Sequence, residues 1–148
     1  MKFNRYPKRD ANTNYFLMPN EIFNFGLCPG EFSVYSYLIK SENRKTYQCY
    51  PSYKTIGAAT NLSRNTVRKY VGQLEEKRFI TTEYTKGFKQ DGKKYNGNLR
   101  YTLRPIQEAL DYFYEKQFKK AAHEQAKAEA KRRLDEYNRK RGLMKNVG

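Results

Sequence analysis

The residues with the most informative chemistry lie close together, between positions 63 and 69. Arg64 and Arg68 carry guanidinium groups that can pair bidentately with O6 and N7 of guanine, and the Asn65 amide can pair with N6 and N7 of adenine. Ser63 precedes them and suits a helix N-terminus, where backbone N–H groups and the helix dipole favour a phosphate. These residue types favour contact with a nucleic acid.

No catalytic or metal-binding arrangement is visible in the sequence. The chain has one histidine, His123, and two cysteines, Cys28 and Cys49, which form no CxxC pair and lie near no histidine. Zinc therefore has no ligand set, and there is no GxSxG motif, Gly-rich phosphate loop or cluster of carboxylates. We expect no enzyme activity, no metal and no cofactor, and no small-molecule ligand is evident. We expect the thiols to be small buried groups, and His123 to face solvent.

The net charge indicates a polyanionic partner. Lys and Arg number 30 against 15 Asp and Glu, which gives a formal net charge of +15. Residues 52–104 hold 12 basic and 4 acidic residues, so just over half of the excess lies there. The 14 Tyr and 9 Phe argue for a compact aromatic core and against a disordered basic tail. No run approaches 18 apolar residues, so no membrane partner is expected.

Hydrophobic periodicity and turn residues predict the elements that position these groups. We expect helices over 19–25, 29–41, 52–60, 63–77 and 105–141, the last ended by Gly142. Strands are predicted over 47–50, 79–84 and 99–103, and residues 85–98 are predicted to be a turn-rich loop. The last two strands pair most simply as a hairpin with a long basic tip. Six aromatic side chains are expected in the core: Tyr35, Tyr37, Tyr47, Tyr50, Tyr70 and Phe79.

The spacing within residues 53–72 predicts a tightly crossed helix pair. Gly57 supplies the small residue that close crossing of two helices needs. Asn61, four positions later, tolerates the positive φ of a tight turn, and Val67 is a compact apolar residue on the second helix. A helix, a strand, this pair and a hairpin follow in the order of a winged helix-turn-helix domain. The predicted fold class is mainly α with a small β-hairpin (α+β), followed by a long C-terminal helix.

Three runs of residues carry a resemblance to a known group. They are Tyr50-Pro51-Ser52-x-x-Thr55-Ile56-Gly57, Leu62-Ser63-Arg64-Asn65-Thr66-Val67 and Leu74-Glu75-Glu76-Lys77-x-Phe79-Ile80. Over about residues 16–103 the chain resembles winged helix-turn-helix proteins of low-GC Gram-positive bacteria, many of them from phages, plasmids and integrative conjugative elements. In that group the second helix of the pair contacts the major groove, and the hairpin wing contacts the DNA backbone or minor groove.

The resemblance implies which residues contact double-stranded DNA. Arg64, Asn65 and Arg68 would contact bases, and the exposed face would also hold Gly72. The DNA backbone would be contacted by Lys54, Ser63, Thr66 and Lys69 and by the wing residues Lys86, Lys89, Lys93 and Lys94. The alternative is an ordinary solvated helix face and a loop whose lysines serve solubility.

The C-terminal segment leaves several interpretations open. Ile106, Leu110, Phe113, Tyr114 and Phe118 form an apolar stripe that must pack on the domain or on a second copy, and we favour a homodimer. Beyond the stripe the segment is rich in Ala, Lys, Glu and Arg, with oppositely charged residues at i,i+4. It can be a solvated helix, a weak coiled coil or an arm that follows DNA.

These observations give one leading hypothesis and one alternative. The chain divides into a loose arm (1–14), a winged helix-turn-helix domain (15–104) and a long helix (105–148). The leading hypothesis is a cytoplasmic, nucleoid-associated bacterial protein that binds specific duplex sites as a transcriptional regulator or accessory factor of a mobile element. The alternative is an origin-binding component of replication or conjugation whose C-terminal helix docks a partner protein.

Overall fold

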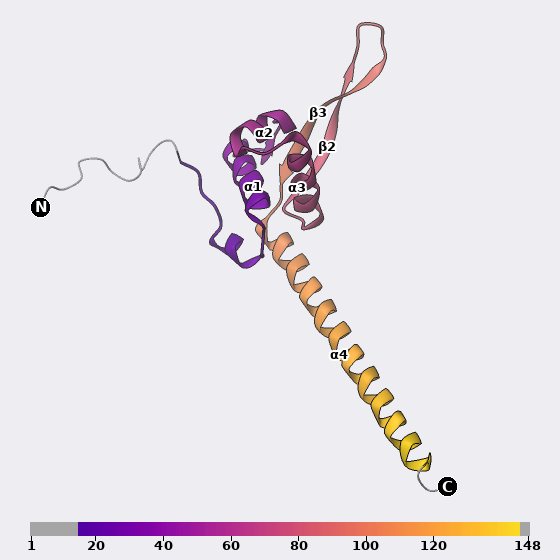
Figure 1. Cartoon of the computed structure of the whole chain (residues 1–148). Helices are drawn as coiled ribbons and strands as arrows, with labels where there is room; N and C mark the ends of the chain where they lie inside the picture. Colours follow the sequence, from indigo (N-terminus) through magenta and orange to yellow (C-terminus); the bar gives the residue numbers. More distant parts are fainter. Residues whose placement is uncertain (1–14, 146–148) are drawn as a thin grey trace, which may run out of the picture. The chain divides into compact units, whose positions relative to one another are not determined.

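The computed structural model describes residues 15–145, apart from the side chains of residues 95 and 96, so the expected N-terminal arm lies outside this part. The elements are η1 (Asn20–Asn24), α1 (Pro29–Ser41), β1 (Gln48–Cys49), α2 (Tyr53–Thr60), α3 (Arg64–Glu76), β2 (Ile80–Phe88), β3 (Lys94–Leu103) and α4 (Ile106–Lys145) (Figure 1). This order confirms the predicted α+β fold class. The chain forms two compact units, Met1–Leu110 and Asp111–Gly148.

Side chains at the helix N-termini set the helix boundaries. The Ser52 and Ser63 hydroxyl oxygens accept hydrogen bonds from the backbone N–H of Thr55 (3.0 Å) and Thr66 (3.2 Å), so α2 and α3 begin where predicted. The helix α1 also has its predicted bounds, but its cap is the Cys28 thiol, which accepts from the N–H of Glu31 at 3.4 Å. Each cap satisfies a backbone donor that the helix itself leaves unpaired.

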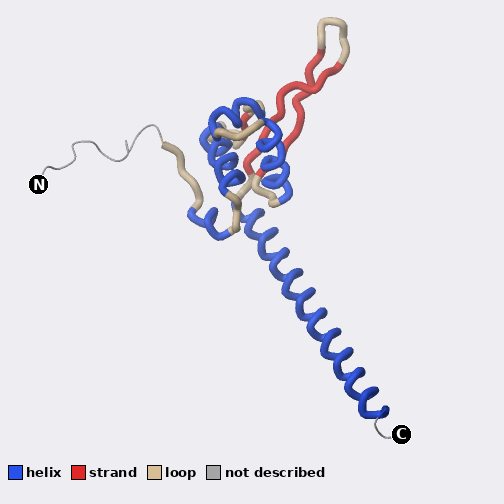
Figure 2. The backbone as a smooth tube through the Cα atoms, viewed as in Figure 1, coloured by secondary structure: helices blue, strands red, loops and turns tan. Residues whose placement is uncertain are grey.

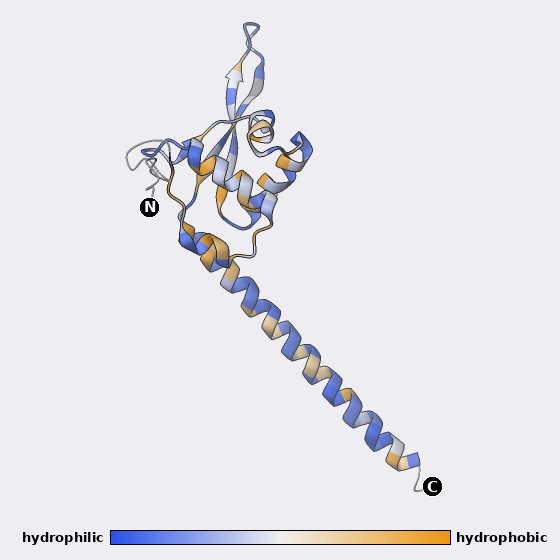
Figure 3. Cartoon of the chain, turned by 60° about the vertical axis from the view of Figure 1, so that its left-hand side comes forward, coloured by the Kyte–Doolittle hydropathy of each residue, from blue (hydrophilic) through white to orange (hydrophobic). Residues whose placement is uncertain are grey.

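The core lies between the three helices and the sheet. Val34, Leu38, Ile56, Val67 and Leu74 are completely buried. Around them, edge-to-face ring contacts join Phe79 to Phe25 (centroids 5.0 Å apart) and to Tyr35 (5.1 Å apart). Apolar residues accordingly concentrate in this unit, whereas most of α4 is hydrophilic (Figure 3).

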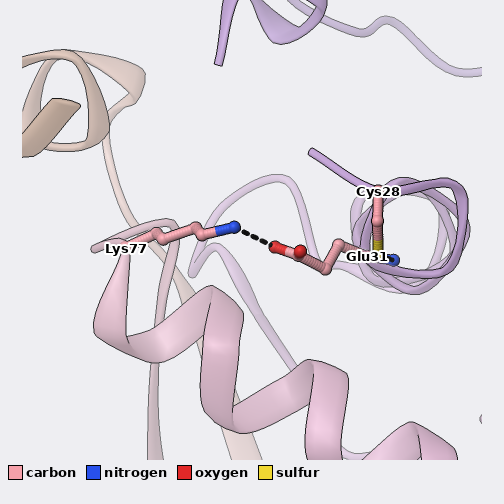
Figure 4. Close-up of polar contacts among 3 residues, drawn as sticks. All are labelled: Cys28, Glu31 and Lys77. Carbon is pink, nitrogen blue, oxygen red and sulfur yellow. Dashed lines mark hydrogen bonds and ion pairs between the residues drawn. The ribbon is translucent and has the colours of Figure 1, made fainter. Parts of the chain in front are cut away.

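A buried ion pair joins the start of α1 to the end of α3. Glu31 is 4% exposed, and the half-buried Lys77 donates from its ammonium group to the Glu31 carboxylate at 2.6 Å (Figure 4). A buried carboxylate needs such a partner, because desolvation without one costs several kcal/mol. The pair fixes α1 against α3 at the same end where the Gly30 Cα faces the Tyr70 ring.

The hairpin differs from the prediction in its length. The three strands form an antiparallel sheet in the order β1-β3-β2, with Ile80 opposite Leu103 and Phe88 opposite Lys94. The predicted loop over 85–98 was wrong, because both strands continue beyond the expected ends and leave only a short turn at the tip (Figure 2). A register shift between Tyr84 and Lys86 lets the backbone ladder continue through a segment whose Gly and Asn residues had indicated turns.

Two of the aromatic residues expected in the core are exposed. Tyr47 and Tyr50 have 58% and 48% of their surface exposed, because they flank a two-residue edge strand and lie outside the packed layer. Tyr35 and Phe79 are buried as predicted, and Tyr37 and Tyr70 are half-buried. Cys49 is buried and Cys28 only half-buried, and both are free thiols. Burial raises the pKa of the Cys49 thiol to about 12.

The long helix α4 has 40 residues and continues past its predicted end. Gly142 lies inside the helix, since one exposed glycine costs only about 1 kcal/mol and Leu143, Met144 and Lys145 extend the helix. His123 is exposed as predicted, and the ion pairs Glu129–Arg133 (2.6 Å) and Glu136–Lys140 (3.2 Å) form. Within residues 15–145, no helix is both long enough and apolar enough to cross a membrane.

Candidate nucleic-acid interface

The turn between α2 and α3 has the geometry that the sequence predicts. Asn61 adopts the left-handed conformation (φ 57°, ψ 40°) at the end of α2. Gly57 is buried, and a Cβ added to it would lie 2.5 Å from the Leu62 carbonyl oxygen. Only glycine allows this approach, which brings the Val67 side chain against α2. The two helices are therefore held at a fixed crossing by one small residue and one strained turn.

Hydrogen bonds join the hairpin to the end of α3. The Glu75 carboxylate accepts hydrogen bonds from the backbone N–H of Thr82 (3.0 Å) and from its hydroxyl (2.9 Å). These bonds connect the last turn of α3 to β2. The sequence analysis did not identify Glu75 or Thr82 as functional, because a surface Glu and a strand Thr separated by seven residues give no local signal.

Two tyrosines also lie at this junction of α3 with the hairpin. Burial raises the pKa of Tyr53, and the nearby Tyr84 raises it further, whereas the Arg68 guanidinium lowers it. Tyr84 is 57% exposed on β2. The sequence analysis named neither of them as a candidate site residue. Tyr84 follows Thr82 by two positions, so the period of a strand could have placed them on one face.

Part of the chain matches a known family of domains. Residues 26–80 match the family model described as "Helix-turn-helix domain". The fold is a winged helix-turn-helix. A possible transcriptional regulator from Methanosarcina mazei Go1 aligns over 68% of this chain and 78% of its own length, at 14% identity and a TM-score of 0.44. A MarR family transcription regulator aligns over 68% of this chain and 58% of its own length, at 14% identity and a TM-score of 0.39. No curated protein matches the sequence.

The second helix of the winged helix-turn-helix has two distinct faces. Val67, Val71 and Leu74 are buried, and Tyr70 is half-buried. The opposite face carries the predicted polar residues Arg64, Asn65, Arg68, Lys69 and Gly72, all exposed. Contact with base edges in a groove requires such exposure, and α3 presents these residues over about two helical turns.

Ser63 and Thr66, two of the predicted backbone-contact residues, already have a structural role. Their hydroxyl groups hydrogen-bond to each other at 2.7 Å, and the Ser63 oxygen also caps α3. Ser63 is exposed and Thr66 half-buried. A hydroxyl has one donor and two acceptor positions, so these groups have only part of their capacity left for a phosphate.

A hollow beside the turn brings together predicted residues from both helices. Its volume is about 530 Å³, and it is lined by Lys54, Gly57, Ala58, Asn61, Leu62, Ser63 and Arg64. Lys54 from the first turn of α2 thus shares a concave surface with Arg64 from the first turn of α3. A single phosphate group could be contacted by both cations there.

The wing carries four predicted lysines, all of them exposed: Lys86, Lys89, Lys93 and Lys94. The Lys94 ammonium lies 6.0 Å from the centre of the Phe88 ring, which is itself 66% exposed. Lys89 and Lys93 are joined at the tip by a backbone hydrogen bond of 2.9 Å.

In the described residues, no group of three or more His, Cys, Asp or Glu could hold a metal ion.

Proposed function

We propose that the protein binds double-stranded DNA at specific sites and acts as a non-enzymatic transcriptional regulator. The observation that carries the proposal is the exposed face of α3, where Arg64, Asn65 and Arg68 lie side by side on the second helix of a winged helix-turn-helix. Arg and Asn are the side chains that best distinguish guanine and adenine in the major groove. The wing lysines and Lys54 would supply affinity for the backbone.

The test begins with selection of bound duplexes from a random pool, followed by measurement of the Arg68→Ala variant. We expect this variant to bind the preferred site more weakly by about 1–3 kcal/mol while its affinity for random duplex changes much less. The matched control is Arg44→Ala, an exposed arginine in the segment between α1 and β1. An equal loss on both duplexes would make Arg68 a phosphate contact only, and failure to select any site would contradict sequence-specific binding.

We also propose that the protein is a homodimer that associates through the first turns of α4. Tyr114 and Phe118 are 55% and 75% exposed, and they continue the apolar stripe that begins at Ile106. Large exposed aromatic groups in a row favour association with a second copy. Sedimentation of the double variant Tyr114→Glu, Phe118→Glu should then give the monomer mass, and an unchanged dimer mass would contradict this surface.

The biological setting that we propose is the bacterial cytoplasm and nucleoid, with a role as regulator or accessory factor of a mobile element. It rests on the sequence resemblance of residues 16–103 alone. Recovery of a palindromic site would support the dimeric regulator, because the symmetry of paired half-sites mirrors that of the protein.

A further inference from the structure

The charges on the distal part of α4 are unevenly distributed around the helix. Residues 116–145 hold 11 basic and 4 acidic residues, and every side chain there is exposed. At about 100° per residue, a sector of about 120° contains seven of the basic residues and none of the acidic ones. We call this sector the basic face: Lys116, Lys119, Lys120, Lys127, Lys131, Arg141 and Lys145.

The rest of this segment is electrically balanced. It holds the four acidic residues and four basic ones, Arg132, Arg133, Arg139 and Lys140. Both ion pairs of the segment, Glu129–Arg133 and Glu136–Lys140, lie in this balanced sector. The whole excess of seven positive charges is therefore on about a third of the helix surface.

The concentration of positive charge on the basic face destabilises α4. Lys116 and Lys120, Lys127 and Lys131, and Arg141 and Lys145 are like-charged neighbours at i,i+4. Each such pair opposes helix formation, because like charges one turn apart repel each other. Solubility alone does not need this segregation, because mixed charges would serve it without the repulsion. A polyanion bound along the face would relieve it.

Phe118 belongs to the proposed dimer surface, but the apolar residues after it form neither a protein seam nor a membrane-binding face. Beyond Phe118, the large apolar residues are Leu134, Tyr137, Leu143 and Met144, all of them exposed. At about 100° per residue they spread over about half of the circumference, and Leu134 and Tyr137 lie within the sector of the basic face. A coiled coil needs a continuous apolar seam, and an interfacial helix needs a continuous apolar face. The basic face extends about 45 Å at 1.5 Å per residue, long enough to follow several phosphates of a duplex.

We propose that the basic face is a second DNA-binding surface, which contacts the phosphate backbone of double-stranded DNA without sequence preference. The inference deepens the proposed function, because both surfaces would bind the same ligand. The contacts of α3 would select the site, and the basic face would add affinity that falls steeply with salt.

The experiment compares two variants of the full chain with equal changes in charge. The face variant is Lys116→Gln, Lys120→Gln, Lys127→Gln, Lys131→Gln, and the matched control is Arg132→Gln, Arg133→Gln, Arg139→Gln, Lys140→Gln. Glutamine keeps a high helix propensity, and circular dichroism verifies that α4 remains helical. Affinity for a random-sequence duplex is measured over a range of salt concentrations.

The expected result is a difference in salt dependence between the variants. The slope of log K against log salt should become shallower by about 3 in the face variant and by less than about 1 in the control. Equal changes in both variants would show a general effect of net charge and overturn the proposal. An unchanged slope in the face variant would also overturn it, and a simultaneous change in oligomer mass would instead assign the face to a protein contact.

The proposed function can fail separately. If no preferred site is selected but the face variant still loses its salt slope on random duplex, specific recognition is wrong and the basic face stands. If Arg68→Ala binds the preferred site more weakly while the two four-residue variants have equal salt slopes, specific recognition by α3 stands and the basic face is wrong.

Discussion

Two glycines in the helix pair have opposite environments at the residue scale. A Cβ at Gly57 would meet the Leu62 carbonyl oxygen at 2.5 Å, whereas a Cβ at Gly72 would have nothing within 4 Å. Gly57 is therefore required by the crossing of α2 and α3. Gly72 only weakens the helix that contains it, through its backbone entropy.

The two alanine variants should consequently change stability in opposite directions. Gly57→Ala should lower the free energy of unfolding by about 1–3 kcal/mol, because backbone atoms must move to admit the methyl group. Gly72→Ala should raise it by about 0.5–1 kcal/mol. Urea denaturation measures both, and a Gly57→Ala variant as stable as the wild type would contradict the close crossing.

Tyr101 offers a second prediction at this scale. Its ring is completely buried, and its hydroxyl has no hydrogen-bond partner in the described part of the chain. Burial raises the pKa of Tyr101 far above that of an exposed tyrosine, so only the neutral form fits the fold. The contribution of this group to stability is complete below the unfolded pKa of about 10 and is lost as the pH rises toward the folded value.

Tyr101→Phe should therefore match or exceed the wild type in stability by about 1 kcal/mol at neutral pH, because it removes an unsatisfied buried hydroxyl. The free energy of unfolding of Tyr101→Phe should also decline less than that of the wild type between about pH 9 and 12. Some decline remains in the variant, because burial also raises the pKa of Tyr35 to about 12. Denaturation at several pH values measures this. The control Tyr47→Phe, at an exposed position, should change neither quantity, and a large loss in Tyr101→Phe would reveal a partner for the hydroxyl.

At the scale of elements, the sequence predicted the helices better than the hairpin. Ser52, Ser63 and Asn61 act locally, through caps and a turn, so the bounds of α2 and α3 were predicted to within about one residue. The hairpin depends on pairing across the strands, and its bulge near Thr85 is invisible to local patterns. The exposed face of α3 was implied by the family resemblance, but the hydrogen bonds between Glu75 and Thr82 required the folded chain.

The wing leads to a prediction about salt dependence. If Lys93 and Lys94 contact phosphates, the double variant to Ala should reduce the salt slope of duplex binding by between one and two. Lys40→Ala, Lys45→Ala is the matched control, since both of these lysines are exposed near the end of α1. The slope of the control should stay at the wild-type value. A wing variant that also keeps that slope would remove the wing from the interface.

At the scale of the whole molecule, the buried core ends before the long helix does. Among the residues whose burial the structure describes, all buried ones lie between Ile22 and Ala109, and the compact unit ends at Leu110. The remaining residues of α4 form a helix whose stability must come from local pairs such as Glu129–Arg133 or from partners. The sequence predicted this helix from composition but gave no reason for Leu110 as the boundary.

A chain that ends at Leu110 should therefore keep a folded winged domain. We expect its free energy of unfolding to lie within about 1 kcal/mol of the full chain, and we expect it to sediment as a monomer if α4 joins two copies. Urea denaturation and sedimentation test the two statements. Loss of the cooperative transition would show that residues 111–148 belong to the folding unit, and a persistent dimer would move the interface elsewhere.

The different burial of the two cysteines allows thiol labelling to report local and global unfolding separately. The Cys28 thiol sits half-buried at the first turn of α1, while the Cys49 thiol is buried and donates a hydrogen bond to the Leu38 carbonyl oxygen. Because only an accessible thiolate reacts, a thiol reagent should label Cys28 when the end of α1 frays and Cys49 only when the core opens. The chain has no Trp, so these two labelling rates can follow local and global opening where indole fluorescence cannot.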